Sequence, residues 1–297
     1  MQIRQSNKKV LPALSQALVY VLLGVLAVLI LVPLLWVFMA SVKQNSEFYG
    51  NPWTLPQGIH LQNFVDAWTK ARMGDFMLNS VITTALGLVM LLVFALPAAY
   101  VLSRFRFKLR RFMNFSFMGG LFINVNYIVV PIFLMLVAGD RQLKAWGAGA
   151  FFLNNLFILA LVYAATALPF TIYLLSGYFA TLPTAYEEAA YIDGASRFTT
   201  MVQVMFPLAL PAIITVILFN FLSFWNEYII AMTLLSSATG PKTLPVGLMY
   251  LTKAQNARSE FGQLYAGLVL VLLPTLILYM LVQRKLTQGM ALGGLKG

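Results

Sequence analysis

Charged side chains are absent from six long stretches of this sequence. The first uncharged run lies between Lys9 and Lys43, and the others cover 76–103, 112–139, 145–186, 198–226 and 261–283. Each run is long enough to cross a bilayer as a helix, because about 20 apolar residues span the hydrocarbon core. The pattern predicts an all-α polytopic membrane protein with a single transmembrane domain over residues 1–297.

We expect six transmembrane helices, at about 14–40, 77–103, 112–137, 152–176, 207–232 and 262–283. The longest run could barely hold two short helices. Its apolar core, 156–175, has the length of one span and its flanks are rich in Gly, Asn, Ser and Thr, so we assign it one helix. Prolines lie in or beside several spans, at Pro97, Pro131, Pro169, Pro211 and Pro274. Membrane helices tolerate proline, so we expect kinks rather than broken helices.

Composition agrees with a membrane protein and removes several enzyme classes. Apolar residues make up 60% of the chain and charged residues 10%, which is too little charge for a water-facing shell. The chain has no cysteine and a single histidine, His60, which argues against a disulfide framework, a metal site or a serine triad. The net charge of +11 is scattered over short segments, so it indicates membrane topology rather than nucleic-acid binding.

Basic residues orient the chain. With the N-terminus inside, the inner segments hold twelve of the twenty Lys and Arg residues. Five of them lie in the loop 104–111, which contains no acid, and short basic loops of this kind stay in the cytoplasm. We therefore predict a multi-pass protein of the cell membrane with both termini cytoplasmic. Segments 41–76 and 233–261 then face outward and are long enough to form short helices.

The inner loop 177–206 predicts a helical hairpin. Thr184 and Glu187 have the spacing of a capping box, which would start a helix over 185–192. The following Asp193-Gly194 is a helix stop, and Ser196 can cap a second helix.

That second helix carries an apolar stripe at Phe198, Met201, Val202 and Met205, spaced as one helical face. Such a stripe on the cytosolic side indicates a partner protein. The alternative is a helix that lies on the lipid headgroups, but Arg197 is the only basic residue there, whereas interfacial helices favour several.

The loop resembles the EAA motif of ABC importer permeases. Glu188-Ala189-Ala190 is followed after three residues by Gly194, and after nine more by Val204-Met205-Phe206-Pro207. The family pattern has Ile and Leu where this chain has Val204 and Phe206. Fragments along the rest of the chain resemble the sugar branch of that family, as the second permease subunit of maltose-type importers: Pro33-Leu34-Leu35-Trp36, Ala99-Tyr100, Ser103-Arg104-Phe105-Arg106-Phe107, Trp225-Asn226-Glu227 and Gly293-Gly294-Leu295-Lys296-Gly297.

The resemblance implies a type I ABC importer permease fold (MetI-like) and a coupling helix that docks on an ATP-hydrolysing subunit. The residues expected at this contact are Glu187, Glu188, Ala189, Ala190, Asp193, Gly194, Phe198, Met201 and Pro207. In the tail 284–297, it implies that Gly293, Gly294 and Lys296 reach the same subunit, whereas composition alone predicts a disordered end. The chain has no G-x-x-x-x-G-K-[ST] phosphate loop, so ATP and Mg²⁺ are assigned to the partner.

A polar stripe crosses the fifth predicted span. Asn220, Ser223 and Glu227 share one helical face, and Glu227 is the only charge that we place within a span. Intramembrane acids are candidate functional residues, so the stripe is a candidate translocation path. Alternatively, Glu227 lies at the outer end of the span and serves in gating or helix packing. Four asparagines are weaker candidates that we expect to form interhelical hydrogen bonds: Asn124, Asn126, Asn154 and Asn155.

The sequence therefore favours a non-enzymatic permease subunit of an ATP-driven carbohydrate importer. The implied partners are a second permease subunit, two ATP-binding subunits and an extracytoplasmic solute-binding protein. An amino-acid or peptide permease is the alternative within the superfamily. An ion-coupled transporter is disfavoured because one span-end glutamate is a poor supply of intramembrane titratable groups, and an intramembrane hydrolase because the spans contain no cysteine, histidine or paired acids.

Overall fold

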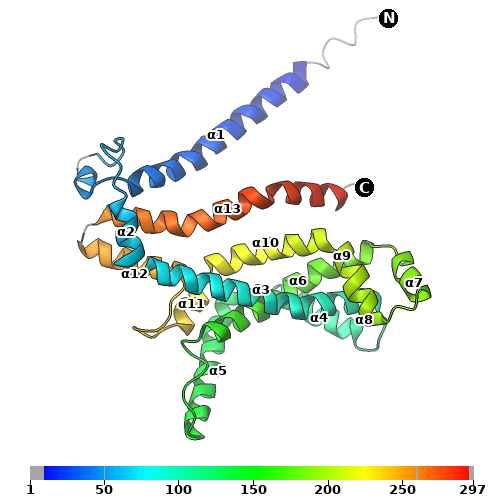
Figure 1. The fold of residues 1–297 in the computed structure, drawn as a ribbon. Helices are drawn as coiled ribbons and strands as arrows, with labels where there is room; N and C mark the ends of the chain where they lie inside the picture. Colours follow the sequence, from blue (N-terminus) through cyan, green and yellow to red (C-terminus); the bar gives the residue numbers. More distant parts are fainter. Residues whose placement is uncertain (1–9, 50, 259, 294–297) are drawn as a thin grey trace, which may run out of the picture. The chain divides into compact units, whose positions relative to one another are not determined.

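The computed structural model describes residues 10–49, 51–258 and 260–293, and this part of the chain is helical with no strand. The α-helices are α1 (Val10–Ser41), α2 (Gln62–Thr69), α3 (Met73–Arg104), α4 (Arg110–Gly120), α5 (Val125–Ala145), α6 (Leu156–Thr181), α7 (Ala185–Ile192), α8 (Arg197–Thr199), α9 (Phe206–Leu208), α10 (Leu210–Asn226), α11 (Ile229–Leu234), α12 (Leu244–Arg258) and α13 (Phe261–Gly293) (Figure 1). A 3₁₀ turn, η1 (Asn45–Phe48), follows α1, and a π-helix, η2 (Thr200–Met205), follows α8.

Four helical segments are long and apolar enough to cross a membrane unbroken: Ser15–Ser41, Met73–Arg104, Leu156–Thr181 and Phe261–Leu281. Two further candidates are bent pairs. Helices α4 and α5 meet at 103°, and the segment Arg197–Leu208 meets α10 at 74°. The all-α polytopic class is confirmed, with four spans among the described residues, or six if each bent pair forms one.

Proline behaves as predicted inside the long helices but not at the second bend. Pro97, Pro131, Pro169 and Pro274 lie within continuous helices. Pro211 instead lies in the first turn of α10, directly after the bend, where its missing N–H leaves no hydrogen bond unmade. The expectation of a kink rather than a break is wrong at this position.

The chain divides into two compact units. The larger one comprises 72–250 and 271–297, and its core is the pair α3 and α6, which run side by side, with α10 packed on both (Figure 1). Small residues allow this approach: a side chain at Gly87 would lie 3.2 Å from the Phe224 ring and 3.4 Å from the Ala160 carbonyl. Buried Ala95 and Ala99 extend the seam along α3. Close packing at small residues is the usual source of helix association in lipid.

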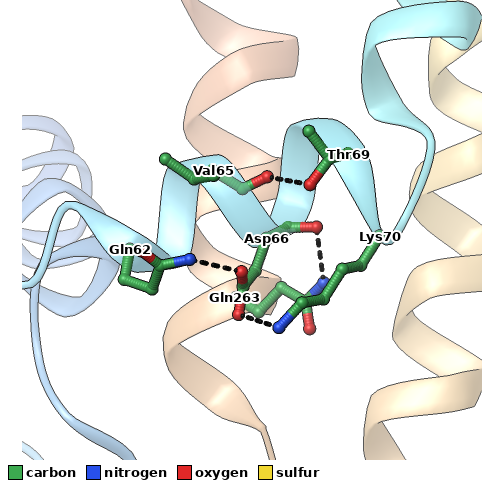
Figure 2. Close-up of polar contacts among 6 residues, drawn as sticks. All are labelled: Gln62, Val65, Asp66, Thr69, Lys70 and Gln263. Atoms are coloured by element: carbon green, nitrogen blue, oxygen red, sulfur yellow. Dashed lines mark hydrogen bonds and ion pairs between the residues drawn. The ribbon is translucent and has the colours of Figure 1, made fainter.

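The smaller unit comprises 1–71 and 251–270. Asn63 of α2 donates to the carbonyls of Ser41 and Lys43, both at 2.9 Å. Figure 2 shows Gln263 of α13 reaching α2, where it donates to the Asp66 carbonyl at 3.0 Å. These side-chain bonds to backbone carbonyls join the end of α1, helix α2 and the start of α13, which are far apart in the sequence.

Candidate functional site

Helix α7 and the turn after it form the first candidate site. Gly194 has φ +80°, a left-handed conformation that glycine adopts without strain, and the Ala195 N–H closes the turn on the Ala190 carbonyl at 2.9 Å. Ser196 then caps the next helix, its Oγ accepting from the Thr199 N–H at 3.1 Å. The helix stop at Gly194 and the cap at Ser196 are confirmed.

The predicted capping box at the start of α7 is wrong. Thr184 makes no side-chain cap hydrogen bond, and Glu187 turns toward the protein core. Tyr100 of α3 donates its hydroxyl to Glu187 Oε1 at 2.7 Å, and Arg104 Nε lies 3.5 Å from Glu187 Oε2. Arg104 also donates to the Leu182 carbonyl at 2.6 Å. This Glu187–Tyr100–Arg104 cluster ties α7 to the end of α3, and a carboxylate with a cationic partner lowers the cost of burying each charge.

The predicted apolar stripe divides between the protein core and its surface. Met201 and Met205 are buried, whereas Phe198 is 70% exposed and Val202 39%. The reason is η2: its π-helical turn is wider than an α-turn, so residues that would share one α-helical face separate. The four-residue stripe was therefore predicted from the wrong helical period.

An exposed face remains around α7. Glu188, Ala189 and Asp193 are exposed, and Ile192 is 86% exposed. Tyr186, Tyr191 and Phe198 add further exposed apolar surface. Ala190 is half-buried and Pro207 is exposed. Acidic side chains beside bare apolar groups form a surface suited to a basic, partly apolar partner.

The second candidate site is a cavity of about 500 Å³ in the larger unit. Asn220, Ser223 and Glu227 all line it, together with Asn124 and Asn126 of the preceding bent pair. Half of the remaining lining residues are aromatic: Tyr163, Phe170, Phe219 and Phe224. The structure thus brings the predicted stripe and two of the weaker candidates to one hollow.

Glu227 lines the cavity and also accepts hydrogen bonds that hold neighbouring helices together. Its Oε1 accepts the Ile230 N–H at 2.8 Å, and its Oε2 accepts the Ala231 N–H at 3.0 Å and the Tyr163 hydroxyl at 3.0 Å. The carboxylate therefore caps α11 and links it to α6.

Asn220 is buried and donates to Thr171 Oγ1 at 3.0 Å and to the Val216 carbonyl. Ser223 is the most exposed member of the stripe.

Two of the four asparagines have a role other than the interhelical bonds expected of them. Asn124 caps α5 by accepting the Asn126 N–H, and Asn155 caps α6 by accepting the Phe157 N–H. Asn154 does bridge elements, since its Oδ1 accepts the Ser237 N–H at 2.8 Å. Two of these amides thus start helices, because the first N–H groups of a helix have no partner within it.

Comparison with known proteins decides the family. Residues 92–292 match the family of binding-protein-dependent transport system inner membrane components. The diacetylchitobiose uptake system permease protein NgcG of Streptomyces coelicolor is 34% identical over 93% of this chain and 88% of its own, and the probable ABC transporter permease protein YurM of Bacillus subtilis is 32% identical over 96% and 90%. This chain belongs to that family of ABC transporter permeases.

A solved structure extends the permease's likeness to the fold. A chain of a bacterial ABC transporter involved in import of the acidic polysaccharide alginate superposes with a TM-score of 0.75 at 26% identity, covering 96% of this permease and 99% of that chain. The permease is thus a multi-pass membrane component of an importer and not an enzyme, as the sequence predicted.

Several side chains that contact the candidate residues of this permease were not identified from the sequence. Tyr100 and Arg104 hold α7, and Tyr163 holds Glu227. Arg104 was interpreted as an orientation signal and as part of a family fragment, and Tyr100 as part of a family fragment, but neither was predicted to contact Glu187. Among the predicted tail residues, Gly293 ends α13, while Gly294 and Lys296 lie outside the described residues.

Proposed function

We propose that this permease carries a carbohydrate across the cell membrane as one subunit of an ATP-driven importer. The observation that carries the proposal is the cavity at Asn220, Ser223 and Glu227, which is lined by amide, hydroxyl and carboxylate groups together with aromatic rings. Sugars present hydroxyl groups for such polar partners and apolar faces for rings, and pockets that combine the two fix a ligand's orientation. The names of the diacetylchitobiose and alginate systems support the same substrate class.

The proposed importer has four membrane-associated subunits. A second permease pairs with this one, two ATP-binding subunits bind and hydrolyse ATP with Mg²⁺, and an extracytoplasmic solute-binding protein delivers the sugar to the outer segments. Both termini and α7 lie in the cytoplasm, as the basic loop 104–111 indicates. The family's description as a component of a binding-protein-dependent system supports this assembly.

Helix α7 is the proposed coupling element. Its exposed face, with Glu188, Ala189 and Ile192, docks on the ATP-binding subunit, while its buried Glu187 transmits the motion to α3. Phe198 extends the docking surface, and Gly194 sets the turn that presents it. In the same proposal, Gly293, Gly294 and Lys296 of the tail contact that subunit. Closure of the ATP-binding subunits then moves the helices around the cavity, and access alternates between the two sides of the membrane.

Uptake assays test the substrate class. Cells expressing the importer genes should accumulate labelled oligosaccharides in preference to dipeptides or amino acids. Uptake should stop when ATP is depleted and persist when a protonophore collapses the ion gradient. Uptake of a peptide instead would place the chain in the other branch of the superfamily, and uptake that follows the ion gradient would contradict ATP coupling.

Two substitutions test the docking surface. Glu188→Lys reverses an exposed charge, and Gly194→Phe strains the turn; each should lower co-purification of the ATP-binding subunit or reduce the sugar transported per ATP. Asp75→Lys, at an exposed acid on a segment predicted to be outer, is the matched charge reversal and should leave ATPase association intact. Normal complex yield and normal uptake in both loop variants would overturn the coupling role.

Glu227→Gln tests the path. The amide retains the shape but offers only one accepting oxygen for three donors, so we expect slower transport with unchanged subunit assembly. Glu227→Asp, which retains two accepting oxygens, is the control. A change in affinity for sugar would assign Glu227 to the path, whereas a fall in rate at constant affinity would assign it to gating. Unchanged affinity and rate would remove it from both.

A further inference from the structure

The five basic residues of the loop 104–111 have different environments. Arg104 is engaged by Glu187 and the Leu182 carbonyl. Arg110 donates to the carbonyls of Leu102 and Ser103 at 2.8 and 3.1 Å, which satisfies free carbonyls at the end of α3. Arg106, Lys108 and Arg111 are exposed, and no carboxylate lies within 4.0 Å of them in the described part of the chain.

These three unpaired cations line a cavity. It has a volume of about 600 Å³ and is formed by residues 106–118, with Phe107 and Phe115 beside the charges. Because the loop contains no acid, the cavity concentrates positive charge at one place. Guanidinium and ammonium groups in such an arrangement favour a phosphate, which arginine binds through two parallel hydrogen bonds.

A second cavity adjoins the basic one and has a different lining. Its volume is about 500 Å³, and it lies among residues of α3, α4 and α6, most of them apolar, including Leu102, Phe117, Ile172 and Leu174. Arg110, Asn114 and Met118 line both cavities, so a charged hollow continues into an apolar one. The buried Ser103 Oγ in the second cavity has no hydrogen-bond partner among the described residues.

We propose that the two cavities together bind one anionic phospholipid. The phosphate lies among Arg106, Lys108 and Arg111, and an acyl chain follows the apolar groove between α4 and α6. Basic pockets between membrane helices at the cytoplasmic side bind anionic headgroups in this way. Exposed Phe112 and Phe115 on α4 suit a helix at the membrane interface. A free phosphate would leave the apolar cavity unused, so the lipid is the better fit.

Lipid retention by the assembled importer tests the site. The full complex is purified in mild detergent with added phosphatidylglycerol or phosphatidylcholine, and bound lipid is counted by native mass spectrometry. The wild type should retain phosphatidylglycerol in preference to phosphatidylcholine. The combined variant Arg106→Gln, Lys108→Gln and Arg111→Gln should lose it by roughly tenfold or more, since each basic residue near an anionic surface contributes several-fold. Arg141→Gln, Lys144→Gln and Lys253→Gln together remove the same charge from exposed positions elsewhere and should change nothing.

The triple substitution removes basic residues that help to orient the chain, so it could alter the topology. A second variant therefore keeps every basic residue. A side chain at Gly177 would point into open space in the wall of the apolar cavity, so Gly177→Leu should fill that cavity and expel the lipid with all basic residues in place. Equal retention of phosphatidylglycerol in the wild type and both variants would overturn the proposal. So would displacement by inorganic phosphate, or a triple variant that keeps its lipid but loses the ATP-binding subunit.

Discussion

Two adjacent glutamates in α7 face opposite surroundings. Glu187 is buried and held by Tyr100 and Arg104, whereas Glu188 is exposed. The coupling role proposed for α7 needs both kinds of contact, one to the partner that pushes the helix and one to the helix that it moves. The Glu187–Tyr100–Arg104 cluster provides the internal contact, and it joins residues 87 positions apart in the sequence.

Replacing each glutamate by glutamine should separate the two roles. Glu187→Gln keeps an oxygen for Tyr100 but leaves Arg104 without a counter-charge in a largely buried setting, so we expect a loss of about 2 kcal/mol in stability and a melting temperature several degrees lower. Glu188→Gln should leave the melting temperature unchanged, because exposed substitutions usually have little effect. Thermal unfolding of the purified permease measures both. If the two variants unfold alike, the buried cluster does not stabilise α7.

Sequence reasoning singled out Glu187 but predicted the wrong contact for it. The spacing of Thr184 and Glu187 matches a capping box, yet a local motif competes with any tertiary partner of the same carboxylate. Tyr100 and Arg104 offer a stronger one, since a hydrogen bond to a charged group stabilises more than one between neutral groups. Only the packing of α3 against α6 shows that these partners are close to α7.

At the scale of helices, the turn after α7 requires a glycine at position 194 because of its backbone conformation, and not because a side chain there would clash with a neighbour. A Cβ at Gly194 would meet nothing within 4 Å, but φ is +80°. Gly194→Ala should therefore cost about 1 kcal/mol from strain alone, and Gly194→Asn less, because asparagine visits the left-handed region more readily. Gly24→Ala within α1, where a Cβ also has free space, should cause no loss. Chemical or thermal unfolding of the three variants gives the comparison, and a neutral Gly194→Ala would contradict the strain argument.

The 3₁₀ turn η1 is expected to contain a pH-sensitive contact. Glu47 accepts the N–H groups of Gln44 and Gln57 at 2.8 and 2.9 Å, and these hydrogen bonds lower the pKa of its carboxyl below the ordinary value of 4.5. Because the folded-state pKa is lowered, the ionised carboxylate stabilises the folded loop at pH values above the ordinary pKa of 4.5. This stabilisation is lost as the pH falls through the folded-state pKa. Trp53 fluorescence should thus change below pH 4.5 in the wild type. In Glu47→Gln that transition should be absent; its persistence would assign the change to another group.

The helix breaks were the least predictable elements. Uncharged runs indicate where the chain can enter a membrane, but they carry no information on whether a helix is continuous through it. Asn124 and Pro211 each begin a new helix, through a side-chain cap in one case and a missing N–H in the other. Asparagine and proline also occur inside loops and kinked helices, so their presence does not by itself predict a break. Whether the helix breaks there depends on the bend angle, which tertiary packing sets.

For the whole molecule, hydropathy predicted the class, which is confirmed, whereas the orientation that charge predicts stays a prediction. The scarcity of charge was decisive because a helix in lipid satisfies its own backbone, so long apolar runs have few alternatives. The cavity was predictable in part: Asn220, Ser223 and Glu227 share a helical face by spacing alone. Its aromatic wall was not, because Tyr163 and Phe170 of α6 resemble ordinary core residues until α6 is placed beside α10.

The orientation of the permease can be tested on the native chain, because it contains no cysteine. A single cysteine at Ser46 or at Lys108, both exposed, gives two reporters on segments predicted to lie on opposite sides. In intact cells, a membrane-impermeant maleimide should label Ser46→Cys and leave Lys108→Cys unlabelled. Permeabilised cells supply the control, since both positions should then react. The reverse pattern in intact cells would place α7 outside the cytoplasm. Docking of α7 on an ATP-binding subunit would then be impossible, because ATP is available only on the cytoplasmic side.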